Sequence, residues 1–385
     1  MSVLDSPIDH SVEAHDGLVQ AVREFARSEL IDLDRRCDRE ESSCCVEFQR
    51  FCEMGLTGLR IPESFGGLDC PAVTYAHLIR ELAYASPSVA VTLGVHNMVG
   101  EIIAKYAHEP LRSELLPKLV EPDNLTGFAI SEPDAGSDTA AAKTRAEKVA
   151  GGWKLFGNKM WVTNGMTGRW FCVLARTGEV GGKDDFSMLL LDARQAGVKR
   201  AMIKGKMGIR GSETAEWALD GAFVPESNML GKLGDGRRIG LTSLGGGRIG
   251  IASQALGIAQ ACLDEMARYA RQREQFGRPI ADFQAIQWMI ADSATEIAAA
   301  QQLIDRAAAM KDAGRKFARE GSMAKLFASE AANRIAYRAV QVHGGSGFVN
   351  DCRVEQLYRD ARITTIYEGT SEVQRIVISR ELVRE

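Results

Sequence analysis

The first third of the chain carries apolar residues at helical spacing. One series places apolar side chains about one helical turn apart: Leu18, Val22, Phe25 and Leu30. Pro71 suits the first turn of a later helix, and Ser86-Pro87 begins another. We therefore expect residues 1–125 to form a helical domain.

The pattern changes to one typical of strands over residues 126–230. Residues 153–159 and 160–163 are predicted to form two strands joined at Gly157-Asn158. Two further apolar runs have the length of strands: 171–175 and 186–191. We expect a small, mostly antiparallel β domain between helical ones.

Helical spacing returns over residues 231–385, in unusually long stretches. Residues 248–273 contain no proline, Pro279 suits the start of a second helix, and a third is predicted over 315–342. Long alanine-rich helices joined by short loops favour a helix bundle. The predicted fold class is mainly α with a central β domain.

Composition narrows the class of protein. The chain has 385 residues, 45% of them hydrophobic, and a net charge of −4, so neither nucleic acid nor an anionic membrane is an expected partner. No apolar run reaches the roughly 18 residues of a membrane span. Residues 1–16 contain four acidic residues and no lysine or arginine, unlike a targeting peptide. We expect a cytoplasmic protein.

Four of the eight cysteines lie close together: Cys37, Cys44, Cys45 and Cys52. Seven-residue spacings would put Cys37 with Cys44, and Cys45 with Cys52, on shared faces of a helix. No Cys-x-x-Cys pair exists, and no histidine lies between Cys37 and Cys70, so we predict no metal site. Buried or half-buried thiols in a reducing compartment are the expected alternative.

Two segments near the end of the chain carry candidate chemistry. Residues 341–347 read QVHGGSG, a helix that runs into glycines whose backbone amides can approach a phosphate. Residues 367–370 read YEGT, and Glu368 has apolar neighbours that would raise its pKa, as a general base at neutral pH requires. The alternatives are a glycine turn that simply ends a helix and a glutamate that caps the next one.

Longer motifs surround these segments. They are AISEPDAGSD at 129–138, MWVTN at 160–164, REQFG at 273–277 and YEGTSE at 367–372. With the helical, β, helical order, they resemble the acyl-CoA dehydrogenase flavoprotein family over essentially the whole chain. The resemblance implies an N-terminal helical domain, a middle β-barrel, a C-terminal four-helix bundle, bound FAD, and a homotetramer built as a dimer of dimers.

The resemblance assigns the catalytic base to Glu368. It would take the α-proton of an acyl-CoA thioester while the β-hydrogen leaves as hydride to flavin N5. Gly369 would let the chain bend close to the substrate, and Tyr367 would form part of the acyl pocket wall. Some family members carry the base at the position of Gly247, where glycine cannot act.

The resemblance also assigns cofactor contacts. Phe128, Ile130 and Ser131 would line the flavin ring, with Trp161 and Thr163 packed against it, although a tryptophan beside a strand is more often core. Further positions match contacts to the adenine dinucleotide, several of them reaching a neighbouring subunit's flavin: Arg273, Phe276, Gln284, Gln341, Gly344, Gly345, Thr370 and Glu372. For Arg273, ordinary helix termination is the alternative.

Substrate contacts are matched less closely. Ser137 corresponds to a residue near the CoA pantetheine, and Arg248 to one at the thioester end of the pocket. Residues expected to narrow the base of the pocket, and so to favour a short, branched or cyclic acyl group, are Val91, Val95 and Ile251. Asp138 and Asp360 are expected to be structural.

Two positions depart from the family pattern. Gly245 replaces an aspartate that usually helps to bind CoA, which puts the CoA contacts in doubt. Gln356 stands where a basic residue is expected, and the lost salt bridge bears on packing more than on chemistry.

We therefore expect an acyl-CoA dehydrogenase that yields a 2,3-enoyl-CoA and is reoxidised by electron-transfer flavoprotein. One alternative is a related flavin monooxygenase or oxidase, although such relatives generally lack the YEGT carboxylate. A second is a non-catalytic or nucleic-acid-binding relative that retains flavin. The sequence leaves open the direction of the reaction and the identity of the acyl group.

Overall fold

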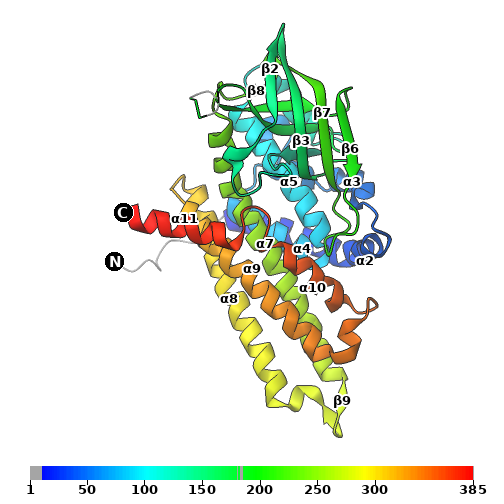
Figure 1. The fold of residues 1–385 in the computed structure, drawn as a ribbon. Coiled ribbons are helices and arrows are strands. Elements are labelled where there is room, and N and C mark those ends of the chain that lie inside the picture. Colours follow the sequence, from blue (N-terminus) through cyan, green and yellow to red (C-terminus); the bar gives the residue numbers. More distant parts are fainter. Residues whose placement is uncertain (1–10, 180, 183–184, 385) are drawn as a thin grey trace.

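The chain folds into helical, β and helical parts in that order, which confirms the predicted fold class. A computed structural model describes residues 11–179, 181–182 and 185–384 (Figure 1). The sheet lies at one end, the far tips of the long C-terminal helices lie at the other, and N-terminal helices lie between them (Figure 1). No helix in the described ranges is long and apolar enough to cross a bilayer.

The N-terminal part consists of short helices around two longer ones, α4 and α5. The α-helices are α1 (Ser11–Phe25), α2 (Ile31–Glu40), α3 (Phe48–Glu53), α4 (Ala72–Ala85), α5 (Pro87–Tyr106) and α6 (Leu111–Leu119). The Ser86 hydroxyl accepts a hydrogen bond from the Val89 amide at 3.1 Å, with Pro87 in the first turn, so α5 begins where the sequence predicts.

The expected helical pairing of the cysteines is wrong. Helix α2 ends at Glu40 because Glu41 takes a left-handed conformation with φ 47°, and Cys44–Glu47 forms a separate 3-10 helix. Cys37 and Cys44 are free and buried. Among the residues that the structure describes, no group of three or more His, Cys, Asp or Glu side chains could hold a metal ion.

The central part is an eight-stranded sheet in the order β6-β7-β3-β2-β4-β5-β8, with β1 paired in parallel to β4. The strands are β1 (Thr126–Ala129), β2 (Arg145–Val149), β3 (Gly152–Thr163), β4 (Trp170–Arg176), β5 (Phe186–Asp192), β6 (Val198–Met202), β7 (Thr214–Pro225) and β8 (Met229–Leu230). Most pairings are antiparallel, as predicted.

The predicted turn at Gly157-Asn158 is wrong, because β3 runs through it as one strand. Gly157 instead takes φ 140°, next to a shift in the pairing register with β7 between Leu155 and Phe156. A Cβ atom on Gly157 would lie 2.8 Å from the Thr144 Cα, so glycine is needed for this irregularity.

The C-terminal part contains three long helices that pack side by side, followed in the chain by the shorter helices α10 and α11. These are α7 (Gly236–Gln272), α8 (Gln284–Asp312), α9 (Ala318–His343), α10 (Arg353–Ile363) and α11 (Ser371–Arg384). Between α7 and α8 lies a small hairpin of β9 (Glu274–Gln275) and β10 (Arg278–Pro279).

Two predicted helix starts need correction. Helix α7 begins at Gly236 rather than at Arg248, so it includes the three consecutive glycines 245–247, whose low helix propensity is overridden by packing. Helix α8 begins at Gln284, because Pro279 is followed by a short 3-10 helix, Ile280–Asp282.

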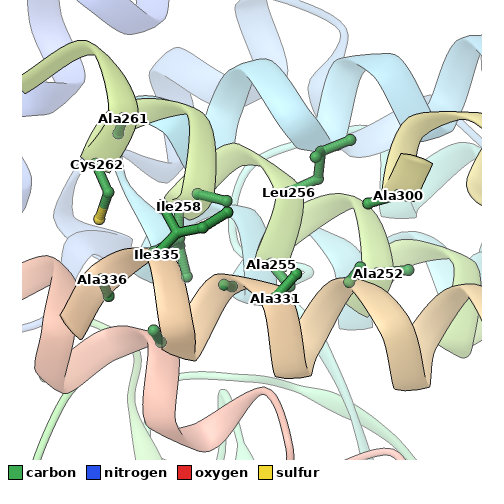
Figure 2. Packing of buried hydrophobic residues seen from close by; sticks show 14 of the residues in the cluster. Ala252, Ala255, Leu256, Ile258, Ala261, Cys262, Ala300, Ala331, Ile335 and Ala336 are labelled. Atoms are coloured by element: carbon green, nitrogen blue, oxygen red, sulfur yellow. The ribbon is translucent and has the colours of Figure 1, made fainter. Parts of the chain in front are cut away.

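Small side chains let these helices approach closely. Alanines of α7 and α9 face each other across the core, with a few isoleucines filling the remaining space (Figure 2). On another face of α7, a Cβ atom on Gly257 would lie 2.4 Å from the Arg80 carbonyl oxygen of α4. This contact fixes α4 against α7, and the candidate active site lies along the same pair of helices.

The departure at Gln356 has a clear structural setting. Gln356 is buried and donates through Nε2 to Asp34 Oδ2 at 2.6 Å, while Ser86 Oγ donates to Asp34 Oδ1 at 2.5 Å. Burial raises the pKa of Asp34 to about 6. Where a basic residue would neutralise this carboxylate, glutamine only hydrogen-bonds to it, so the ionised form is disfavoured.

We predict that Asp34→Asn stabilises the protein at neutral pH. Because the pKa of Asp34 in the folded state lies above its ordinary value of 3.8, ionisation destabilises the fold above pH 6 and has no effect below pH 4. Chemical unfolding at pH 8 should show a gain of up to about 3 kcal/mol, absent at pH 3.5.

Asp38→Asn is the matched control. Asp38 accepts hydrogen bonds from Arg359 at 2.6 and 2.8 Å, so loss of its charge should destabilise the fold at pH 8. Equal destabilisation by both variants would contradict the account of Asp34.

Candidate active site

A pocket lies between α4, α5 and α7, and Glu368 closes one side of it. Helix α4 contributes Tyr75 and Ile79, and α7 contributes Gly247 and Ile251. The α5 face follows the helical repeat: Ala90, Val91, Gly94, Val95, Met98 and Glu101. The three side chains expected to narrow the pocket, Val91, Val95 and Ile251, all line it.

Glu368 lies in a sharp turn between α10 and α11. Glu368 has φ 54° and Gly369 has φ 88°, so two consecutive residues are left-handed. For a non-glycine residue this conformation is strained, and such strain concentrates at functional sites. Trp161 and Phe276, two other predicted site residues, also have positive φ, at 60° and 52°.

Polar side chains hold the backbone of this turn. Gln374 Nε2 donates to the carbonyl oxygens of Glu368 at 3.2 Å and Gly369 at 2.7 Å. The buried Lys325 donates through Nζ to the same Gly369 oxygen at 2.7 Å. The hydrogen bonds that its carbonyl oxygens accept therefore hold the turn in place, and the Glu368 side chain is left free to face the pocket.

The Glu368 carboxylate has the environment of a general base. Its Oε2 is buried and has no hydrogen-bond partner among the described residues. Burial raises the pKa of Glu368 to about 7, with Arg248 and Lys325 acting in the opposite direction. A carboxylate with a pKa near the working pH can accept a proton and release it again.

Gly247 lies directly against this carboxylate. A Cβ atom at that position would be 2.6 Å from Glu368 Oε2 and 3.5 Å from Met98 Sδ. The alternative base position is therefore adjacent to Glu368, and any side chain there would displace the carboxylate. Gly247 itself has no side chain that could act as a base, and the base role of Glu368 stays a prediction.

The pocket has one apolar, closed end. Along α7 from Gly247, the walls are Ile251 and then Gln254, whose Nε2 donates to the Pro87 carbonyl oxygen at 2.8 Å. The Tyr367 hydroxyl donates to Gln254 Oε1, so Tyr367 lies behind Gln254 and does not itself line the pocket, and its role in the acyl pocket wall stays a prediction. Ile79, Ala90 and Gln254 are each 1% exposed.

The opposite end of the pocket is charged and more open. Glu101, whose side chain is 35% exposed, pairs with Arg60 at 3.1 Å and Lys311 at 2.8 Å. Burial alone would raise the pKa of Glu101, but Lys311 and Arg60 lower it to about 2. Next to this end, the Gly246 backbone is so close to Lys311 that an added Cβ atom would lie 2.9 Å from Nζ.

Arg248 follows Gly247 on α7 and is close enough for its charge to act on Glu368. Its Nη1 donates to Ser322 Oγ at 3.2 Å, and its Nε is buried with no hydrogen-bond partner among the described residues. Gly245, the site of the missing aspartate, is buried, and a Cβ atom there would contact only the Phe317 ring at 3.9 Å. Space for a side chain exists there, so packing does not require glycine.

The predicted flavin-lining residues cluster on β1, β3 and the loop after β1. The Ser131 carbonyl oxygen accepts from the Met160 amide at 2.9 Å, and the Ile130 carbonyl oxygen accepts from Lys159 Nζ at 3.1 Å. Trp161 is 57% exposed, so its interpretation as a simple core residue is wrong. Phe128 and Thr163 are partly buried, and Ser137 is exposed.

A second group of predicted cofactor residues lies far from Glu368. Arg273 begins the loop after α7, about 39 Å from Gly247 along the helix. The predicted residues at this tip of the bundle are all exposed: Arg273, Phe276, Gln284, Gln341, Gly344 and Gly345. Stacking of Tyr269 on His343 at 4.2 Å brings the ends of α7 and α9 together here.

Thr370 and Glu372 lie at the start of α11, which begins at Ser371. Thr370 Oγ1 accepts a hydrogen bond from the Val373 amide at 3.3 Å, as a helix N-cap does. Glu372 is exposed in the first turn. These contacts account for the start of the helix, and a cofactor role for either residue stays a prediction.

Sequence reasoning missed Lys325, Gln374 and Tyr75. Lys325 was visible as a single charged residue amid small and apolar neighbours on a predicted helix, which is a signal of a buried lysine. Gln374 and Tyr75 gave no such signal. Their roles depend on the way that α11 and α4 meet the pocket.

Comparison with known protein families gives matches along most of the chain. The chain matches the acyl-CoA dehydrogenase N-terminal domain over residues 12–123, the middle domain over 127–222 and the C-terminal domain over 234–383. Proteins of this family are FAD enzymes, as the resemblance implied.

Three similar proteins span almost the whole chain. An acyl-CoA dehydrogenase of Bacillus subtilis is 40% identical, covering 94% of this chain and 96% of that protein. Acryloyl-CoA reductase (NADH) of Anaerotignum propionicum is 38% identical, covering 95% of this chain and 94% of that protein. The mitochondrial short-chain specific acyl-CoA dehydrogenase of Mus musculus is 38% identical, covering 97% and 90%.

Solved structures show the same fold. Butyryl-CoA dehydrogenase of Megasphaera elsdenii has a TM-score of 0.94 at 33% identity, covering 99% of this chain and 100% of that one. A chain in the structure of the electron transferring flavoprotein of Acidaminococcus fermentans has a TM-score of 0.95 at 34% identity, with the same coverage. Glutaryl-CoA dehydrogenase of Mycobacterium smegmatis in complex with FADH2 has a TM-score of 0.91 at 27% identity, covering 98% and 96%. The chain belongs to the acyl-CoA dehydrogenase family.

Proposed function

We propose that this enzyme removes one hydrogen from each of the α and β carbons of a short, branched or cyclic acyl-CoA, with Glu368 as the α-proton base. The observation that carries the proposal is the buried, unpartnered Oε2 of Glu368 at the wall of an otherwise largely apolar cavity. A carboxyl group with an unpartnered buried oxygen is costly to retain, and a raised pKa in a cleft indicates a functional group.

The turn supplies a second element of the reaction. An α-proton becomes acidic enough only when charge on the thioester oxygen is stabilised, and the Glu368 N–H is the donor that we assign to that oxygen. Gly369 lets the backbone come close to the substrate, and the carbonyls on the other side of the turn are held by Lys325 and Gln374. Removal of an oxyanion donor of this kind typically costs about 3–4 kcal/mol.

The described residues fit a flavin beside this pocket. Trp161 is 57% exposed and so presents an aromatic surface to solvent, next to Ile130, Ser131 and Thr163. A flavin held by these residues would supply the acceptor for the β-hydrogen, which leaves as hydride. The protein's own part is to hold the thioester between this face and Glu368.

Pocket length supports a short acyl group. Ile251 lies about one helical turn, or 5.4 Å, from Gly247, and Val91 lines the same pocket from α5. Short-chain specificity of the Mus musculus relative agrees with this proposal. We place the CoA part of the thioester at the charged end of the pocket, which carries Arg60, Glu101 and Lys311. Glu101 is far more exposed than the residues at the apolar end.

We further propose a cytoplasmic homotetramer in which the tip of one bundle completes a neighbour's FAD site. Phe276 and Phe348 are 93% and 84% exposed, and Trp288 of α8 is 63% exposed, which is unusual for such large apolar side chains. The predicted dinucleotide contacts Arg273, Gln284, Gln341, Gly344 and Gly345 lie at the same tip, whereas Thr370 and Glu372 lie at the start of α11. Electron-transfer flavoprotein is the proposed acceptor, in line with the Acidaminococcus structure.

The same site could run the reaction in reverse. Glu368 can return a proton to the α carbon as readily as it removes one, and the Anaerotignum relative is a reductase. An oxidase or monooxygenase is less well supported, since the carboxylate that such relatives generally lack is present and buried.

Glu368→Gln should abolish reduction of the flavin by acyl-CoA while leaving flavin bound. Anaerobic titration of the purified holoenzyme with a panel of acyl-CoA esters, followed by flavin absorbance, measures both. Reduction of this variant at the normal rate would refute the assignment of the base.

The kcat/KM of the enzyme should fall as the pH drops below about 7. Only ionised Glu368 can accept a proton, and its pKa of about 7 places the loss on the acidic side. Rates measured from pH 5.5 to 9 with a short-chain substrate test this, and a profile that stays flat down to pH 5 is incompatible with it.

Butyryl-CoA should be a better substrate than octanoyl-CoA, and Ile251→Ala should reverse part of this preference. Removing the side chain deepens the pocket, and a change of this size is worth about 10-fold or more in the ratio of kcat/KM values. Ile249→Ala on the same helix, buried in the bundle core and not lining the pocket, is the control. A long-chain optimum in the unaltered enzyme would overturn the proposed substrate class.

A further inference from the structure

We propose that Lys325 is a positioning residue for the base: together with Gln374 it clamps the Gly369 carbonyl and so fixes the direction of the Glu368 carboxylate. This inference rests on the proposed function, because it assigns a role within the same site. Lys325 lies on α9, more than 40 positions before the turn in sequence.

The contact itself is specific. Lys325 is 0% exposed, and its Nζ donates to the Gly369 oxygen at 2.7 Å. Gln374 Nε2 reaches the same oxygen at 2.7 Å from the first turns of α11. Two donors from two helices therefore converge on one carbonyl, directly after the catalytic glutamate.

The turn needs such a clamp. Glu368 and Gly369 are both left-handed, and a left-handed glutamate relaxes unless its surroundings hold it. A relaxed Glu368 would move its N–H and its side chain together, since the amide nitrogen and Cβ are bonded to the same Cα. A displacement of about 1 Å of a reacting group can cost about 100-fold in rate.

The charge of Lys325 also acts on the carboxylate. The groups that face Glu368 are Arg248 from α7, Lys325 from α9, Tyr75 from α4 and Tyr367 beside it. The ion cluster of Arg60, Glu101 and Lys311 lines the same pocket. Lys325 is itself surrounded by Glu368, Arg248, Glu330 and Glu372.

Burial lowers the pKa of Lys325 to about 8, with Glu368 acting in the opposite direction, so near neutral pH the lysine is mostly charged. Its positive charge lowers the pKa of Glu368 and so keeps part of the base ionised. Loss of Lys325 should therefore remove both a positional and an electrostatic effect.

Acetyl-CoA separates proton abstraction from dehydrogenation, because it has an α carbon and no β carbon. Exchange of its methyl protons in deuterated water, followed by proton NMR with the holoenzyme, reports proton abstraction by Glu368 without dehydrogenation. For Lys325→Met we expect exchange to slow by about 100-fold and the acidic limb of its pH profile to move up by about one pH unit.

Two variants resolve the two effects. Gln374→Met removes one clamp donor and no charge, so exchange should slow by about 10-fold with the acidic limb unmoved. Lys325→Arg keeps the charge, so it should keep the acidic limb of the unaltered enzyme while exchange stays slower.

Lys206→Met is the matched control for the loss of a buried lysine. Lys206 also donates to backbone carbonyls, those of Ile209 and Ser212, in the loop between β6 and β7. It should lower the unfolding temperature without changing the exchange profile.

The outcomes are distinct. If the unaltered enzyme bleaches with acyl-CoA and Lys325→Met exchanges acetyl-CoA protons at the normal rate with the normal pH profile, the clamp is refuted and the proposed function stands. If the unaltered enzyme neither bleaches nor exchanges, the proposed function itself fails. If Lys325→Met does not fold, the Gln374→Met result decides, and normal exchange by that variant overturns the clamp.

Discussion

Burial of one ionisable oxygen without a partner is the constraint on which the rest of this structure depends. Glu368 Oε2 lies in a cavity between α4, α5 and α7, and no side chain or backbone amide of the described residues satisfies it. The surrounding structure must offset that cost and hold the strained turn that carries the carboxylate. Many features of the bundle can be understood from this requirement.

Close packing of helices shapes the cavity. Glycine at 247 leaves room for the carboxylate itself, and Gly257 lets α7 approach the backbone of α4. Alanines on α7 and α9 bring Lys325 near the turn, since larger residues would move α9 outward (Figure 2). The small side chains in the sequence set the distance between the helices, and the close packing that results buries Glu368 and raises its pKa.

The sequence predicted what is local or repeated. Helical spacing indicated α4 and α5, and Ser86 with Pro87 marked the start of α5 correctly. The YEGT motif identified the carboxylate, and its apolar neighbours predicted the direction of its pKa shift. Recognition of the family then followed from motifs spread along the chain.

What the sequence did not predict depends on contacts between distant segments. Helix α7 runs through three consecutive glycines because packing outweighs propensity, and Gly157 continues a strand because it crosses close to Thr144. The clamp by Lys325 and Gln374 joins three segments that no local pattern connects. In each case tertiary structure decided between local alternatives.

The most direct test of the account is the ionisation of Glu368 itself. Infrared difference spectra of the holoenzyme between pH 5 and 9, compared with those of the Glu368→Gln variant, isolate the carbonyl band of this one carboxylic acid. The account predicts a band that disappears with a midpoint near pH 7 and is absent from the variant. A carboxylate already ionised at pH 5 would contradict it.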